Sequence, residues 1–249
     1  MDLLKIKDPE FLKTLSYKEL NELATEIRCF LIEEISKTGG HLSSNLGIIE
    51  LTIALHYVFN SPEDKLIFDV GHQAYVHKIL TGRAKDFSKL RQFEGLSGYL
   101  KRSESVHDHW EAGHSSTAIA AAAGFEYSRI MKGDTSRVVA IVGDGSLNSG
   151  LSFEALNYLG HQKGLAPIII LNDNEMSISK NVGRLSKLLN KTRSNKLYNF
   201  AIKSKRKWPK FIYSMKVRIA NMIRGFANNL TIFDEFGFSY YGPIDGHDL

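Results

Sequence analysis

Two unusual turns directly follow two apolar runs, and this arrangement constrains the fold more than any other feature of the sequence. The run "VVAIV" leads into Gly-Asp-Gly at 143–145, and the run "PIIIL" leads into Asn-Asp-Asn at 172–174. With a helix predicted from about Ser152 to Gly160, the segment reads as a β-α-β unit with strands at 137–142 and 167–171. Both turns then fall at the carboxyl ends of parallel strands, where sheets of this kind bind their ligands.

Helices and strands alternate through the first 175 residues. Ser16 and Glu19 form a capping-box pattern at the start of a helix, and Gly39-Gly40 ends it. Two further helices are predicted within "LGIIELTIALHYVF" and "STAIAAAAGFEYSRIMK", and a further strand within "KLIFDV" at 65–70. Strands separated by helices predict an α/β fold, in which helices cover both faces of a parallel β-sheet.

The residue types in the two turns indicate their ligand. Gly143 and Gly145 allow a ligand to approach the backbone closely. Asp144 offers a carboxylate oxygen and Asn174 a neutral carbonyl oxygen, and Mg²⁺ prefers an octahedral set of such oxygens. A diphosphate would supply the remaining ligands, favoured by the amino end of the helix near Ser152. Each turn alone is also typical of an ordinary turn or a helix cap, but the two together favour a magnesium diphosphate site.

The composition predicts a globular, cytoplasmic protein. A chain of 249 residues that is 43% hydrophobic can bury a core as one large domain or two small ones. Cys29 is the only cysteine, which excludes a disulfide framework or a cysteine-based metal cluster within the chain. The start lacks a secretory signal pattern, and no apolar run approaches the roughly 18 residues of a membrane-spanning helix.

The segment from Met176 to Phe233 is strongly basic. It holds 14 Lys or Arg and no Asp or Glu, whereas the other 191 residues hold 18 basic and 27 acidic residues, a balance of −9. Its clustered lysines beside Trp208 are compatible with nucleic-acid binding, and "KFIYSMKVRIANMIRGFA" with a membrane surface. The favoured interpretation is a basic helical insertion at 180–233 that packs its apolar face and binds neither nucleic acid nor membrane.

Several longer motifs carry a resemblance to a known family. "GDG" followed some 26 residues later by "NDN" resembles the cofactor motif of the thiamine-diphosphate-dependent, transketolase-like enzymes. The stretches "GGHLSSNLGIIELTIALHYVF", "DVGHQAYVHKILTGR", "KRSES", "GHSST", "LNDNEMSISKNVG" and "GPIDGHDL" narrow it to the 1-deoxy-D-xylulose-5-phosphate synthases. The resemblance extends from about residue 10 to the last residue.

This resemblance implies two cofactors, thiamine diphosphate and Mg²⁺, and a set of site residues. The metal ligands would be Asp144, Asn174 and the backbone carbonyl of Met176. His41 would lie at the reacting end of the cofactor as the catalytic residue, assisting substrate binding and proton transfer. The cofactor-binding residues, around the site or beside the diphosphate, would be His72, Gly113, His114, Ser115, Gly145, Ser146 and Asn174.

Four positions depart from the family pattern. Val76 and Leu100 stand where proline is common, and Ser146 and Asn148 stand where alanine and threonine are usual. None of the four is an expected metal ligand, so they bear on fine geometry and not on the class of cofactor.

The resemblance also implies a limit to what this chain does alone. Residues 1–249 would form a single diphosphate-binding domain, without the pyrimidine-binding and carboxyl-terminal domains of the family. The pyrimidine-binding domain supplies the glutamate that protonates the cofactor's pyrimidine, and neither Glu154 nor Glu175 is expected to replace it. The chain is therefore expected to need a partner domain, on another chain or in a longer gene product.

In the complete assembly, the implied activity is that of a transferase of isoprenoid and thiamine biosynthesis. It would condense pyruvate with glyceraldehyde 3-phosphate, release CO2 and yield 1-deoxy-D-xylulose 5-phosphate. The alternatives are the amino-terminal subunit of a split transketolase, and a non-catalytic remnant that binds the cofactor or a partner. A homo- or hetero-oligomer is expected, with the basic insertion beside the cofactor entrance.

Overall fold

The computed structural model describes residues 1–173, 232–242 and 244–249 of the chain. The chain divides into two units, one made of Met1–Ile178 with Asp245–Leu249 and the other of Ser179–Ile244. The predicted basic insertion falls in the second unit, and nearly all of it lies outside the described residues, as do Asn174 and Met176.

The first unit is built on a three-stranded parallel sheet in the order β1-β2-β3. The strands are β1 (Lys65–Phe68), β2 (Val138–Gly143) and β3 (Ile168–Asn172). The predicted parallel sheet is therefore confirmed. β1 ends two residues earlier than predicted, because Val70 adopts a positive φ of 62° and the chain there turns out of the extended conformation.

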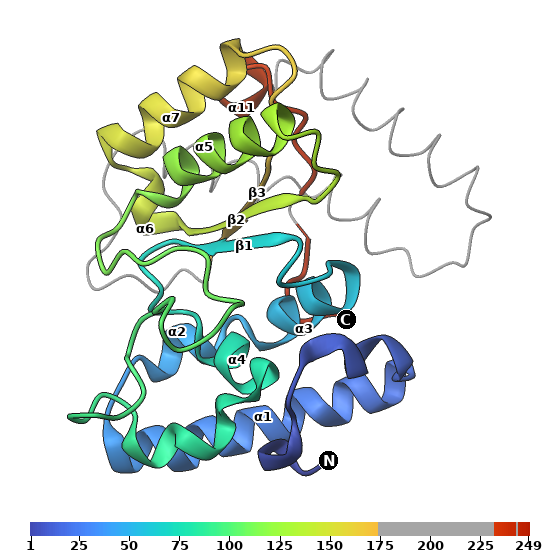
Figure 1. Cartoon of the computed structure of the whole chain (residues 1–249), viewed down its shortest axis with the longest axis vertical. Helices are drawn as coiled ribbons and strands as arrows, with labels where there is room; N and C mark the ends of the chain where they lie inside the picture. The colour runs from blue at the N-terminus through green and yellow to red at the C-terminus, as the bar shows by residue number, and fades with distance from the viewer. Residues whose placement is uncertain (174–231, 243) are drawn as a thin grey trace, which may run out of the picture. The chain divides into compact units, whose positions relative to one another are not determined.

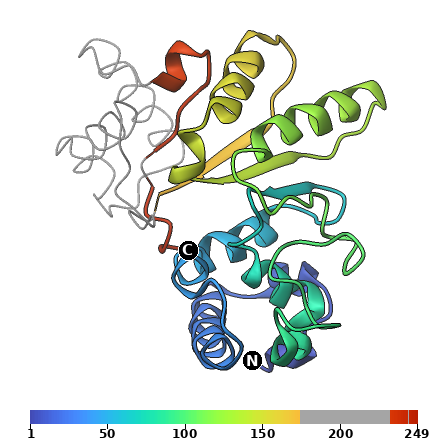
Figure 2. The same ribbon diagram turned by 90° about the vertical axis from the view of Figure 1, so that its left-hand side faces the viewer.

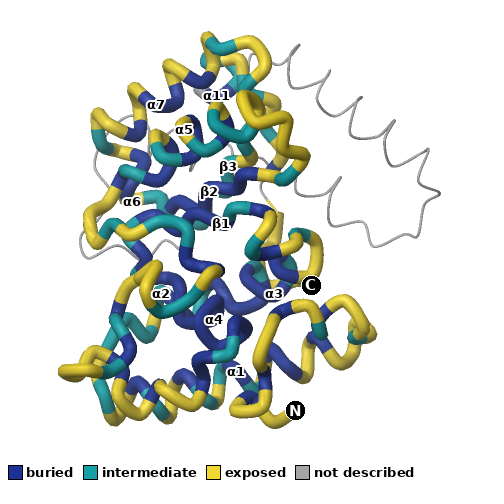
Figure 3. Tube along the Cα trace, in the orientation of Figure 1, coloured by how far each residue is buried: buried dark blue, intermediate teal, exposed yellow. Residues whose placement is uncertain are grey.

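Helices cover both faces of this sheet, as predicted (Figures 1 and 2). α5 (Ala118–Met131) and α7 (Gly150–His161) lie on one face, and α3 (Ile49–Val58) lies on the other. Strand side chains alternate between the faces. The strand side chains directed toward α3 are Leu66, Phe68, Val139 and Ile141. They pack with Ile48, Leu55, Ala74 and Leu100. β1 and β2 are accordingly buried almost throughout (Figure 3).

A layer of helices beneath α3 holds the second core cluster. Its longest member, α1 (Tyr17–Thr38), begins with the predicted capping box, since Ser16 and Glu19 cap each other's backbone, and ends at Gly39. Leu23, Ile27 and Leu31 line its buried side. The shorter elements of the layer are η1 (Leu3–Lys5), η2 (Pro9–Thr14), α2 (Leu42–Leu46), α4 (Tyr75–Lys78), η3 (Ile79–Arg83) and η4 (Ala84–Lys89).

The segment Asp245–Leu249 docks on the same layer of the first unit. Nδ1 of His247 lies 2.9 Å from a carboxylate oxygen of Glu50, whose other oxygen accepts a 2.6 Å hydrogen bond from Arg28. The Tyr17 hydroxyl donates to Asp248 at 3.2 Å, and Leu249 packs against the core cluster. Residues at the end of the sequence thus lie in contact with Tyr17 and Glu50, which are near its beginning.

In the second unit, the described residues include one short helix, α11 (Ile232–Glu235). The Phe233 ring stacks on Tyr240 with centroids 5.6 Å apart, and the Phe238 N–H donates to the Phe233 carbonyl at 2.9 Å. No helix in the described parts of either unit is both long and apolar enough to cross a membrane.

Candidate functional site

The carboxyl edge of the sheet brings the two predicted turns side by side. In the β2–β3 pairing, Gly143 is level with Asn172, so Gly-Asp-Gly and Asn-Asp-Asn begin at the same height on neighbouring strands. The short helix α6 (Asp144–Leu147) starts at once after β2, and Asp144 is half-buried there. The predicted adjacency is confirmed for the starts of the two turns, whereas Asn174 lies outside the described residues and the ligand role of Asp144 stays a prediction.

Three glycines of the predicted site border open space. Apart from its neighbours along the chain, a Cβ atom added to Gly113, Gly143 or Gly145 would meet no atom of the described residues within 4 Å. Gly113 also has a φ of 78°, a left-handed conformation that favours glycine. The backbone at these positions is therefore open to a close approach by a ligand.

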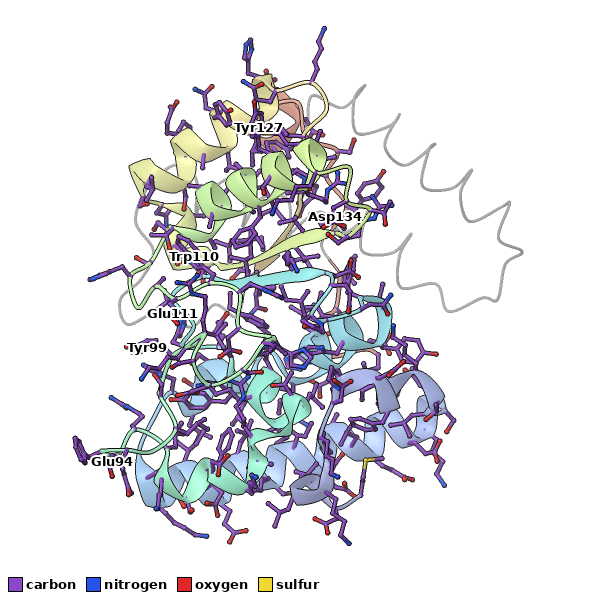
Figure 4. All side chains as sticks on the ribbon, in the orientation of Figure 1. Glu94, Tyr99, Trp110, Glu111, Tyr127 and Asp134 are labelled. Atoms are coloured by element: carbon purple, nitrogen blue, oxygen red, sulfur yellow. The ribbon has the colours of Figure 1, made fainter. Side chains whose placement is uncertain are left out.

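The loop that carries Gly113, His114 and Ser115 is exposed, and a hydrogen bond joins it to the loop that carries His72. The Gly113 N–H donates to the Val70 carbonyl at 3.0 Å, which brings it to the segment that leads into His72. His114 and Ser115 are both exposed. In Figure 4, Trp110 and Glu111, just before this loop, lie along the same side of the molecule as Tyr99.

His41 and His72 lie next to each other. Their rings meet edge to face with centroids 5.6 Å apart, and the rings of Tyr99 and Tyr75 lie 5.7 and 6.2 Å from His41. Nδ1 of His41 is 3.3 Å from the Tyr75 hydroxyl. Burial lowers the pKa of both histidines below the usual value, and the charge of Arg91 lowers the pKa of His41 further. Both imidazoles are thus held neutral at neutral pH, able to accept a proton.

Asn45 is a site-building residue that the sequence reasoning missed. Its buried amide donates to the carbonyls of His41 and His72, each at 2.7 Å, and accepts from the Tyr75 N–H at 2.8 Å. One side chain therefore joins the segment that begins at His41 to the segment that carries His72 and Tyr75. The motif "HLSSNLG" contained this residue, but its partners lie up to 30 positions away in sequence.

The residues present fit a metal-bound diphosphate. Asp144 offers a hard anionic oxygen of the kind Mg²⁺ prefers, and the glycines leave room beside it. Nδ1 of His72 is buried and has no hydrogen-bond partner among the residues that the structure describes, which suits a polar atom that meets a ligand. Within the described ranges, no group of three or more His, Cys, Asp or Glu could hold a metal by itself. A metal here would thus need ligands beyond the side chains of those residues.

A second polar group lies buried around α4, and we name it the histidine cluster: His56, His77, Arg83 and Asp108. Nε2 of His77 donates to Asp108 at 3.1 Å, because a carboxylate can only accept. Nδ1 of His77 then accepts from Nε2 of His56 at 2.9 Å. Arg83 donates to both oxygens of Asp108, at 2.7 and 2.8 Å. This cluster supports α4, and no site role was predicted for its histidines.

The histidine cluster predicts a loss of stability in mild acid. Burial lowers the pKa of His77 to about 4, against an ordinary value of 6.5. The unfolded chain therefore binds a proton more readily, so this contribution is complete above pH 6.5 and falls as the pH drops toward 4. Over that range we expect a loss of about 3 kcal/mol in the free energy of unfolding. Urea unfolding at several pH values measures it, and His77→Gln should flatten the profile. A wild-type profile that is flat from pH 6.5 to 5 contradicts the prediction.

Comparison with known proteins identifies close relatives of the whole chain. A family model described as 1-deoxy-D-xylulose-5-phosphate synthase matches residues 3–249. The chain is 51% identical over 256 residues to the 1-deoxy-D-xylulose-5-phosphate synthase of Geobacillus sp. (strain WCH70), covering 100% of the chain and 40% of that protein. It is 52% identical over 253 residues to the one of Macrococcus caseolyticus (strain JCSC5402), covering 99% and 40%. The chain thus spans about 40% of the length of these relatives.

Solved structures of transketolases share the fold. The transketolase from Leishmania mexicana has a TM-score of 0.57 over 69% of this chain and 30% of its own, at 20% identity. A transketolase mutant from Pichia stipitis has a TM-score of 0.55 over 64% and 27%, at 20% identity. The fold predicted from the alternating helices and strands is confirmed by these neighbours. With a family model that covers nearly every residue and relatives at about half identity, the chain belongs to the 1-deoxy-D-xylulose-5-phosphate synthase family.

Proposed function

We propose that the chain is the diphosphate- and metal-binding half of a 1-deoxy-D-xylulose-5-phosphate synthase that uses thiamine diphosphate and Mg²⁺. In the complete assembly it would take part in condensing pyruvate with glyceraldehyde 3-phosphate, with release of CO2. The observation that carries this proposal is the pair of turns at neighbouring strand ends, in a chain about half identical to such synthases.

Each predicted site residue then has a role at this edge of the sheet. Asp144, Asn174 and the Met176 carbonyl would hold Mg²⁺, with Gly145 and Ser146 beside the diphosphate. The residues lining the remainder of the cofactor would be His72, Gly113, His114 and Ser115. When bound, thiamine diphosphate supplies the stabilised carbon nucleophile of the reaction.

His41 is the proposed proton-transfer residue of this half. Its lowered pKa keeps the imidazole unprotonated at neutral pH, so it can take a proton from a substrate hydroxyl. Tyr75, Tyr99 and His72 surround the ring and fix its direction. The half-buried position limits access of water to the proton that is exchanged.

The proposal includes a partner domain, an oligomeric assembly and a cytoplasmic location. The carboxyl group that protonates the cofactor's pyrimidine would come from a pyrimidine-binding domain, since Glu154 is exposed on α7. A single cysteine supports a reducing compartment. The identity of about 51% to the synthases, against 20% to the transketolases, favours the synthase over a split transketolase.

The test of the proposal is reconstitution of the activity. The purified chain with thiamine diphosphate and Mg²⁺ is expected to release no CO2 from pyruvate, because the acid–base carboxyl group would come from the proposed partner domain. Adding a polypeptide that carries the remaining length of a synthase is expected to give CO2 and 1-deoxy-D-xylulose 5-phosphate when glyceraldehyde 3-phosphate is present. Steady turnover by the chain alone would show that the acid–base group is misplaced, and no turnover in the mixture would favour a non-catalytic remnant.

A further inference from the structure

A buried carboxylate, outside the proposed ligands, joins two loops of the site. Asp69 follows β1 and is only 3% exposed. Its two oxygens accept hydrogen bonds from the N–H groups of Ser116 at 2.8 Å, and of Thr117 and Ala118 at 3.0 Å. Asp69 therefore satisfies the free N–H groups at the start of α5.

The same residue is tied to the loop that carries His72. The Asp69 N–H donates to the Ile141 carbonyl at 2.8 Å, which extends the β1–β2 pairing by one residue. The next residue, Val70, accepts the hydrogen bond from Gly113. The end of β1, the His72 loop and the loop at 113–115 are thus held at one point.

Two serine hydroxyl groups extend this connection to the Gly-Asp-Gly turn. The hydroxyl groups of Ser116 and Ser152 both donate to the Ser146 carbonyl, each at 2.8 Å. The Ser152 hydroxyl also reaches the Ser116 carbonyl at 3.3 Å. All three serines are buried, and Ser116 holds a positive φ of 76°. A carbonyl that accepts hydrogen bonds from two hydroxyl groups of different segments has little freedom to rotate. The two bonds therefore fix the position of Ser146.

The hydroxyl groups of Ser116 and Ser152 are not needed to cap α5 or α7. Ser149 already caps α7 through the Ser152 N–H, so the Ser152 hydroxyl is free to bind elsewhere. The Ser116 hydroxyl likewise points away from α5, toward the turn after β2. Both side chains serve the position of Ser146, a residue beside the proposed diphosphate.

We infer that Asp69, Ser116 and Ser152 are positioning residues. They hold the loop at 113–115 at a fixed distance from Ser146, so that this loop and the Gly-Asp-Gly turn reach one diphosphate. This inference rests on the proposed function. None of the three residues is among the proposed ligands, so their effect would pass through the loops they hold.

The experiment compares serine variants that differ in one contact. Ser116→Ala and Ser152→Ala each remove one hydrogen bond to the Ser146 carbonyl, and Ser149→Ala is the matched control at the cap of the helix that carries Ser152. Calorimetry on the 249-residue chain measures the affinity for thiamine diphosphate and for inorganic pyrophosphate, both with Mg²⁺. Urea unfolding without ligand measures the stability of each variant.

We expect Ser116→Ala and Ser152→Ala each to weaken binding of both probes about tenfold, the size seen when residues that orient metal ligands are removed. The affinity of Ser149→Ala for both probes should stay within about twofold of the wild type. This should hold even if its unfolding midpoint falls as far as those of Ser116→Ala and Ser152→Ala, because loss of a helix cap also lowers stability. Equal affinity for Ser152→Ala and Ser149→Ala overturns the inference. An affinity loss that tracks the unfolding midpoint across all three variants also overturns it.

A second measurement separates this inference from the proposed function. If the wild-type chain binds neither probe, the proposed function fails for the isolated chain, and hydrogen exchange decides the inference. In the ligand-free protein, the segment at 143–149 should exchange at least about tenfold faster in Ser116→Ala and Ser152→Ala than in Ser149→Ala, because the held carbonyl is released. Equal exchange in the three variants would mean that the hydroxyl groups do not fix Ser146.

Discussion

Asp144→Ala is expected to abolish Mg²⁺-dependent binding of thiamine diphosphate. Asp144 is the only anionic side chain in the proposed metal set, and the Mg²⁺ ion would join the protein to a diphosphate that is itself anionic. Loss of a residue that only orients a metal ligand commonly costs 10–100-fold in affinity, so loss of the ligand itself should cost more than about 100-fold. Calorimetry with and without Mg²⁺ measures the effect.

The control for this prediction lies at the other end of the same strand. Asp134 precedes β2 and is exposed, and Figure 4 shows it well away from Trp110 and Glu111. Asp134→Ala changes the net charge by the same amount but should leave cofactor affinity within about twofold, since screening weakens distant surface charges. If Asp144→Ala and Asp134→Ala bind the cofactor equally well, the metal site is wrong.

Asp108→Asn is expected to lower the free energy of unfolding by about 3–5 kcal/mol, the usual cost of leaving one charge of a buried pair without its partner. Burial alone would raise the pKa of Asp108, but the hydrogen bonds from His77 and Arg83 outweigh burial and hold that pKa well below its usual value. The substitution keeps the shape of the side chain and removes the nearer of two carboxylates that Arg83 faces, Asp108 at 2.7 Å, while Glu104 stays at 3.6 Å. Urea unfolding at pH 7.5 measures the difference.

A surface pair serves as the comparison for that prediction. Glu33→Gln removes an exposed carboxylate that Lys37 contacts at 2.8 Å on α1, and it should leave the free energy of unfolding nearly unchanged because solvent screens this pair. Similar losses in Asp108→Asn and Glu33→Gln would show that the histidine cluster contributes no more than a surface pair. The large expected difference follows from burial, because solvent cannot screen the charge of Arg83 once Asp108 is neutral.

Local signals predicted those parts of the fold that depend on neighbouring residues. The capping box of Ser16 and Glu19 acts over three positions, and the structure confirms it. The placement of the two turns followed from the β-α-β pattern, because parallel strands joined by a helix end at one edge of the sheet. A nearby signal was missed at α7, which starts at Gly150 and not at Ser152, because Ser149 is its cap.

The features that escaped prediction depend on partners distant in sequence. Asn45 contacts Tyr75, and Asp69 contacts Ser116, 30 and 47 positions away. Nothing in the local pattern distinguishes such a buried polar residue from one that faces solvent, because only the tertiary fold brings the partner near. The positive φ of Val70 is a similar case: a β-branched residue favours extended backbone, and here the contacts around the strand end override that preference.

Because the segment at 245–249 belongs to the first unit, the second unit is an insertion within the sequence of the first. Ile178 and Asp245, which flank it in sequence, both belong to the first unit, and His247, Asp248 and Leu249 fasten the second flank there. The entropic cost of joining two anchor points by a connecting segment grows slowly with the length of that segment, by only about 0.6 kcal/mol for each doubling. Insertions and deletions between these two anchor points therefore cost the first unit little, so the basic segment can change in length during evolution while β1 and β2 keep their pairing.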